Sequence, residues 1–268
     1  MLTQLITDIS ILWAKYRVQY LNGMANTLIL AVTATLIGCI IGFLCGILQT
    51  IPYSRNDNIV KRFLLRTVRI IIRAYVEIFR GTPMILQAVF IYYGMPYFFG
   101  ISFSDKWTVS IIVVSINTGA YMAESVRGGI MSIDPGQFEG AKAIGMNHWQ
   151  TMLYIILPQT LRNIMPQIGN NYIINVKDTS VMFIIGFSDF FAIHKMVSGA
   201  VFKYFPSAFI EMAGYLCLTL LASFLLRKME KKLAGKSNYE LVTTDQLVMT
   251  AGTYSYSDEE TKQKGEGQ

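Results

Sequence analysis

The sequence has little charge. Only 15% of its 268 residues are Asp, Glu, Lys or Arg, whereas a soluble domain usually carries about 25%. Hydrophobic residues make up 53% of the chain, and the mean hydropathy is +0.41. This combination argues against a globular enzyme and indicates an integral membrane protein. The net charge of +6 does not indicate nucleic-acid binding, because the basic residues do not cluster on an aromatic-rich face.

Residues that carry metal or catalytic chemistry are also scarce. The three cysteines, Cys39, Cys45 and Cys217, lie in apolar runs, which indicates packing residues and not a disulfide framework. The two histidines, His148 and His194, form no HExxH motif, and the chain has no Gly-x-Ser-x-Gly motif. The sequence therefore gives little support to an intramembrane enzyme.

A phosphate-binding loop is missing as well. The nearest match is Gly235-Lys236-Ser237, but the residue five positions before Gly235 is Glu230 and not glycine. We expect no ATP site and no cofactor in this chain.

Long apolar runs predict an all-α integral membrane protein with about five transmembrane helices. A helix needs about 20 residues to cross a hydrocarbon core of about 30 Å. The predicted spans are 24–49, 84–100, 107–126, 160–187 and 207–226. In the first span, Ala34, Gly38, Gly42 and Gly46 recur every four residues, which favours close packing against another helix.

Basic residues predict the orientation of these spans. Most of the 23 Lys and Arg residues lie between the first and second spans, between the third and fourth, and after the last. The positive-inside rule then places the N-terminus outside and the C-terminus in the cytoplasm. Within the first basic stretch, FLLRTVRIIIRAYVEIF (63–79) has the pattern of an amphipathic helix at the cytoplasmic interface, or alternatively of a short sixth span. We expect a permease domain over 1–236 and a polar, disordered tail over 237–268.

One cytoplasmic segment, 134–158, is too polar and too broken to cross the membrane. Asp134-Pro135 is a helix-start pattern, Gly145 a helix stop, and Asn147 a second helix cap. These signals predict a helix ending near Gly145 and a second helix ending at Leu157, before Pro158. The small residues Gly140, Ala141 and Ala143 suit insertion into a groove of another protein, and the alternative is a plain connector.

The segment also carries a motif. Glu139-x-Ala141-x3-Gly145-x9-Ile155-x-Leu157-Pro158 resembles the EAA loop of ATP-binding-cassette (ABC) importer permeases, with Gly140 where that family usually has alanine. YVEIFRGTPMILQAVFIYYGMP (75–96), AYMAESVRGGIMSIDPGQFEGAKAIGM (120–146) and NVKDTSV (175–181) resemble the polar amino-acid uptake subfamily. The similarity extends over about residues 20–230.

This resemblance implies a five-span permease subunit in a prokaryotic cell membrane. In such families two permeases pair as a homodimer or heterodimer, bind two ATPase subunits that hold ATP and Mg²⁺, and receive substrate from an extracytoplasmic binding protein. The EAA loop docks on the ATPase, which implies coupling roles for Glu139, Gly140, Ala141 and Gly145. Glu77, Arg80, Thr82 and Glu124 belong to the recognised signatures, and structural or gating ion pairs are favoured there over substrate contact.

The fifth predicted span contains the candidate substrate residues. Polar side chains at membrane depth usually face a bundle interior or a water-filled cavity. Lys177 is the first candidate for the carboxylate of an amino acid. The alternatives are an internal salt bridge with Asp178 or a position at the mouth of the cavity. Candidates for further polar contacts are Asn171, Asn175, Asp178, Thr179 and Ser180.

Two other readings stay open from the sequence. The polar span would also suit a secondary transporter or channel without an ATPase partner, although residues 1–130 and 131–268 show no obvious internal repeat. The chain could also be the half of a heterodimeric permease that does not contact substrate.

Overall fold

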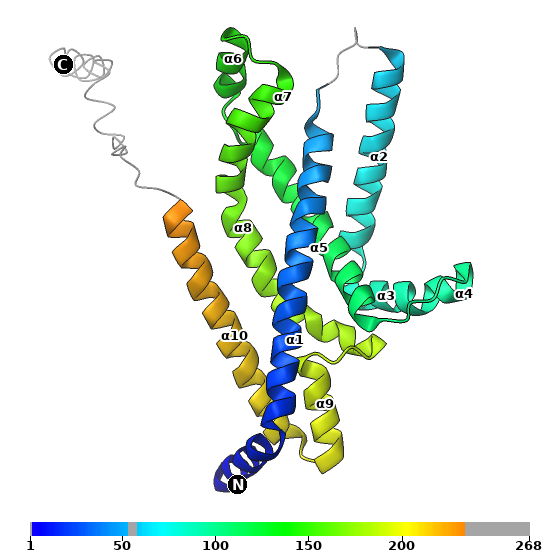
Figure 1. The fold of residues 1–268 in the computed structure, drawn as a ribbon, viewed down its shortest axis with the longest axis vertical. Coiled ribbons are helices and arrows are strands. Elements are labelled where there is room, and N and C mark those ends of the chain that lie inside the picture. The colour runs from blue at the N-terminus through cyan, green and yellow to red at the C-terminus, as the bar shows by residue number, and fades with distance from the viewer. Residues whose placement is uncertain (1, 53–57, 234–268) are drawn as a thin grey trace, which may run out of the picture. The chain divides into compact units, whose positions relative to one another are not determined.

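The structure is a computed structural model that describes residues 2–52 and 58–233. All regular elements in these two ranges are helical, which confirms the predicted fold class (Figure 1). The elements are α1 (Leu2–Thr50), α2 (Ile59–Gly81), α3 (Met84–Val89), the π-helical turn η1 (Phe90–Gly94), α4 (Met95–Phe99), α5 (Lys106–Met131), α6 (Pro135–Ala143), α7 (His148–Thr151), the π-helical turn η2 (Met152–Ile156), α8 (Leu157–Asp178), the 3-10 helix η3 (Thr179–Ile185), α9 (Phe190–Val201) and α10 (Tyr204–Leu233). The predicted tail, 237–268, lies outside the described residues, as does Gly235-Lys236-Ser237.

The small-residue stripe of α1 packs against α5. A methyl group added to Gly38 would meet the Thr118 side chain at 2.6 Å, and one added to Gly46 would meet Val126 at 2.6 Å. The closest approach is at Gly42, where the added carbon would lie 2.3 Å from Met122 Cβ. The predicted packing role of this stripe is confirmed, and α1 and α5 form the central helix pair of the fold.

The apolar core surrounds this helix pair. One cluster joins α1 and α5 to η3 through Leu30, Val113 and Met182, each of which is fully buried. A second cluster joins α5 to η2 and α8 through Met122, Ile156 and neighbouring residues. The polar stretch of α8 is therefore held in place by apolar contacts at both of its ends.

Three of the described helices are long and apolar enough to cross a membrane, and these lie in α1, α5 and α10. The helices His148–Ile185 and Phe190–Val201 form a pair bent by 53°, which gives a fourth span if the pair is counted as one. The predicted span over 84–100 is a shorter apolar helix, Met84–Phe99, interrupted by η1. In Figure 1 it runs across the direction of α1 and α2.

Both π-helical turns precede a proline, and this explains two differences from the prediction. η1 is followed by Pro96 and η2 by Pro158, each in the first turn of the next helix. Proline has no N–H and its ring clashes with the carbonyl four residues earlier, and a widened turn accommodates both effects. The helix predicted to end at Leu157 therefore continues through Pro158 into α8.

Helix α2 is amphipathic, as predicted, but its second half packs against the bundle. Its buried residues are Ile72 and Val76, which belong to a cluster with Ala123 of α5. Figure 1 shows α2 running back beside α1. Three of its basic residues, Arg69, Arg73 and Arg80, line cavities described below.

Candidate functional site

A polar cavity of about 510 Å³ lies where α2, α3, α5 and α8 meet. We call it the polar cavity, and it is lined by Arg80, Gly81, Thr82, Pro83, Met84, Asn117, Thr118, Tyr121, Asn171, Ile174, Asn175 and Asp178. Its lining contains one cation, Arg80, one carboxylate, Asp178, and several amide and hydroxyl groups. This is the lining expected for a small ligand that carries both charges.

Three of the six predicted substrate residues line this cavity: Asn171, Asn175 and Asp178. Lys177 is exposed and is not part of the lining, so its contact with a substrate carboxylate stays a prediction. Thr179 is buried, and its hydroxyl donates a 3.0 Å hydrogen bond to the Val176 carbonyl. Ser180 is half-buried and also lies outside the lining.

Asn175 ties three helices together at the cavity wall. Its Nδ2 donates to Thr35 Oγ1 of α1 at 2.7 Å and to Thr118 Oγ1 of α5 at 2.9 Å. All three side chains are buried. Buried polar groups with complete hydrogen bonds make a rigid wall, because any rearrangement leaves a donor unpaired. Asn175 therefore acts first as a positioning residue for the cavity.

We expect Thr35→Val to destabilise the protein by about 0.5–1.5 kcal/mol, because Asn175 loses one of its two acceptors in a buried site. The measurement is the thermal unfolding midpoint of the purified permease. Thr33→Val is the matched control, since the Thr33 hydroxyl donates only to carbonyls of its own helix, Ile29 and Leu30. Equal effects of the two substitutions would contradict the bridging role.

The turn between α2 and α3 is held by the glutamine of the signature. Gln87 Nε2 donates to the Phe79 and Thr82 carbonyls, each at 2.9 Å. Its Oε1 accepts a 3.1 Å hydrogen bond from Asn117 Nδ2 of α5. These bonds place Arg80 and Thr82 at the cavity.

Arg80 itself forms an ion pair with Glu124 of α5, and its guanidinium lies 5.3 Å from the Tyr121 ring centroid. The interpretation of Arg80 and Glu124 as ion-pair positions is confirmed. Asn117, Thr118 and Tyr121 were not predicted as cavity residues, because they lie in an apolar run that reads as an ordinary span. Asn117 and Thr118 precede Tyr121 by four and three residues, and this spacing on one helix face is a signal that could have identified them.

The segment over 134–158 forms the predicted helix–turn–helix. Asp134 Oδ1 accepts from Gly136 N at 2.7 Å, and Asn147 and Gln150 make a complete capping box. Between the helices, Gly145 has φ +81°, and Met146 N donates to the Ala141 carbonyl at 3.0 Å. This backbone conformation favours glycine and ends α6.

The exposed face of this segment differs from the prediction in one residue. Glu139, Gly140 and Gly145 are exposed, whereas Ala141 is only 2% exposed and packs inward. Large apolar side chains are exposed instead, including Ile144 at 76% and Trp149 at 60%. The surface available to another protein therefore has no side chain at Gly140 and carries large apolar side chains around the turn.

An all-helical, multi-pass protein with a polar cavity between its helices has the make-up of a membrane transport permease. Comparisons with known proteins define the class. The family described as "Binding-protein-dependent transport system inner membrane component" matches residues 38–235. The glutamine transport system permease protein GlnP of Escherichia coli K12 is 32% identical over 213 residues, covering 80% of this chain and 92% of that protein. A putative glutamine transport system permease of Rickettsia felis is 35% identical over 212 residues, covering 79% and 91%.

Solved structures agree. A structure titled as an amino acid ABC transporter with histidines has a TM-score of 0.71 at 32% identity and covers 82% of this chain and 96% of that one. An inward-facing structure of the MetNI methionine ABC transporter, at 20% identity, has a TM-score of 0.67, covers 82% and 98%, and shares the fold.

The chain belongs to the family of binding-protein-dependent transport system inner membrane components, and within it to the polar amino-acid ABC importer permeases. It is a multi-pass inner-membrane permease subunit that works with ATPase subunits and a permease partner. Membership of this family excludes the reading as a secondary transporter or channel.

Proposed function

We propose that this permease translocates a polar amino acid through the polar cavity. The observation that carries the proposal is the presence of both Asp178 and Arg80 in one lining, together with amide and hydroxyl groups. A carboxylate suits the ammonium group of an amino acid, and a guanidinium suits its carboxylate. Arg80 has five N–H donors, so its ion pair with Glu124 leaves donors for a ligand.

The segment α6–α7 is the proposed contact with the ATPase. Exposed Ile144 and Trp149 flank the glycine turn, and an exposed apolar patch of this kind is typical of a docking surface. Glu139, Gly140 and Gly145 supply the exposed motif residues, while Ala141 supports them from inside. In this proposal ATP and Mg²⁺ are bound by the ATPase, and this chain holds no cofactor.

The remaining parts of the proposal rest on the distribution of basic residues and on what the family resemblance implies. The N-terminus lies outside and the C-terminus in the cytoplasm, two permease and two ATPase subunits assemble, and an extracytoplasmic binding protein delivers the amino acid. The α6–α7 segment and the C-terminal end of α1 line one pocket, which includes Gln49, Arg127 and Glu139. This shared location agrees with the prediction that both lie on the cytoplasmic side.

We expect Asp178→Asn to reduce amino-acid uptake at least about tenfold, because a charge-assisted hydrogen bond contributes about 1.5–3 kcal/mol and 1.4 kcal/mol corresponds to a factor of ten. Uptake is measured in vesicles containing the permease with the ATPase and binding protein from neighbouring genes. Assembly and basal ATPase activity of the variant serve as controls. Unchanged uptake would assign this chain to the half of a heterodimer that does not contact substrate.

Lys177→Met belongs in the same experiment. If Lys177 binds the substrate carboxylate, as proposed from the sequence, this variant loses uptake while assembly and basal ATPase activity remain. Retained uptake would leave Arg80 as the carboxylate partner and remove Lys177 from the site.

A further inference from the structure

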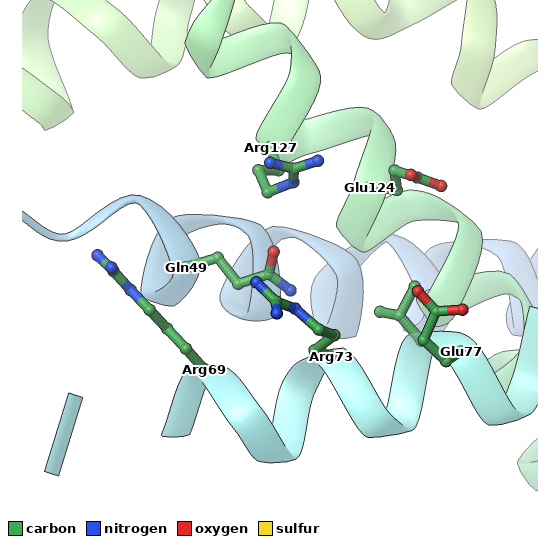
Figure 2. Close-up of a pocket in the computed structure, with 7 residues that line it drawn as sticks. Gln49, Arg69, Arg73, Glu77, Glu124 and Arg127 are labelled. Atoms are coloured by element: carbon green, nitrogen blue, oxygen red, sulfur yellow. The ribbon is translucent and has the colours of Figure 1, made fainter. Parts of the chain in front are cut away.

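A second cavity, of about 300 Å³, lies between α2, α5 and the end of α1. We call it the basic cavity. The polar and charged residues that line it are Gln49, Arg69, Arg73, Glu77, Glu124 and Arg127 (Figure 2). In Figure 2 the three arginines and Gln49 lie to the left of the two glutamates, so the charges are segregated within the cavity.

The arginine side of this cavity has an excess of positive charge. Glu124 is already paired with Arg80, and Arg69 donates to the Ile51 carbonyl at 2.5 Å. Within the described part of the chain, neither Arg73 nor Arg127 has a carboxylate at ion-pair distance. Two guanidinium groups facing one small cavity are suited to an oxyanion, because their planar donors match a carboxylate or phosphate.

The basic cavity connects the two sites already described. Arg80 lines the polar cavity while its partner Glu124 lines the basic cavity, so their ion pair bridges the two linings. At the other side, Gln49 and Arg127 line both the basic cavity and the pocket beside α6–α7. A continuous line of polar residues therefore runs from the polar cavity to the coupling segment.

We propose that the basic cavity binds the carboxylate of the transported amino acid after it leaves the polar cavity. This inference rests on the proposed function. The carboxylate passes from Arg80 to Arg73 and Arg127, and the Arg80–Glu124 pair stands between the two positions. Glu124 competes with the carboxylate for Arg80, which favours release toward the basic cavity and opposes return.

The test is equilibrium binding of a radiolabelled amino acid to the purified permease–ATPase complex in nanodiscs. Glutamine, histidine, arginine and cystine are screened first, and the tightest binder is used. The wild-type complex is expected to bind two molecules per permease chain. Asp178→Asn retains the site in the basic cavity, whereas Arg127→Gln and Arg73→Gln each weaken that site at least about tenfold.

Arg66→Gln is the matched control, because Arg66 is an exposed arginine of α2 outside the cavity lining, and it is expected to bind as wild type. If Arg127→Gln fails to assemble, Arg127→Lys keeps the charge and loses the planar donors, and is expected to weaken the same site less. One site per chain in the wild type, or wild-type binding by Arg127→Gln and Arg73→Gln, would overturn the proposal.

Two further binding measurements test whether the oxyanion in the basic cavity is the carboxylate of the amino acid. The corresponding amine without a carboxylate is expected to lose binding in the basic cavity, and equal binding would count against the proposal. Inorganic phosphate, or nanodiscs rich in anionic lipid, is expected to compete only weakly. If either occupies the site and excludes the amino acid, the carboxylate assignment is wrong. No amino-acid binding at either site would overturn the proposed function as well.

Discussion

Gly42→Val is expected to abolish the folded permease. Gly42 lies where α1 crosses α5, and even the first side-chain carbon at this position would lie 2.3 Å from Met122 Cβ and 2.8 Å from the Met122 backbone carbonyl carbon. Because part of this contact is with backbone, a change of side-chain conformation in α5 cannot relieve it. The two helices would have to move apart along the whole stripe.

The expected loss is large compared with the stability of a membrane bundle. Overpacking by a single group costs about 1–3 kcal/mol when the surroundings can adjust, and helix association in lipid depends on close packing between small residues. Moving α1 from α5 also disturbs the contacts of Gly38 with Thr118 and of Gly46 with Val126. Valine adds two methyl groups beyond the first carbon, so the total free-energy cost is expected to exceed the stability of the bundle.

The yield of monodisperse permease after detergent extraction measures this effect. Gly42→Ala adds only the first side-chain carbon, so it is expected to lower both the yield and the thermal midpoint, but less than Gly42→Val does. Gly128→Ala adds the same carbon on α5, where nothing lies within 4 Å, and is expected to behave as wild type. A normal yield of Gly42→Val would show that the α1–α5 contact is not needed for folding.

Much of the fold could be predicted because its signals are local. The caps at Asp134 and Asn147, the stop at Gly145 and the glycine stripe of α1 each depend on residues a few positions apart, and all are present in the structure. The interruption of the helix over 84–100 was missed because hydropathy does not register a π-helical turn before Pro96.

The cavity could be predicted only in part. Lys177 and Asp178 are adjacent, and one residue along an α-helix turns the side chain by about 100°. Which of the two faces the cavity therefore depends on the rotation of α8, which is set by packing such as the Asn175 bonds to Thr35 and Thr118. Composition identifies α8 as a polar span but does not give this rotation.

Gly145→Val is expected to uncouple transport from the ATPase. Gly145 has φ +81°, a conformation that costs residues with a side chain about 1–2 kcal/mol, and more for a β-branched residue. The first side-chain carbon at this position meets no steric obstacle, because nothing lies within 4 Å of it. Its main effect is therefore expected on the backbone, which would change the angle between α6 and α7 and move Ile144 and Trp149 away from their proposed docking positions.

Gly140→Ala separates this backbone effect from a simple loss of glycine. Gly140 lies in α6 with open space around it, as Gly145 does, but its φ is not positive. Alanine there removes a helix penalty of about 0.5–1 kcal/mol, so this variant is expected to keep or increase coupling.

The measurement is ATP hydrolysis stimulated by the loaded binding protein, together with uptake in vesicles. We expect at least a tenfold loss of both for Gly145→Val, with basal hydrolysis by the ATPase unchanged. If both glycine variants lose coupling equally, the left-handed turn at Gly145 is not what positions the docking surface.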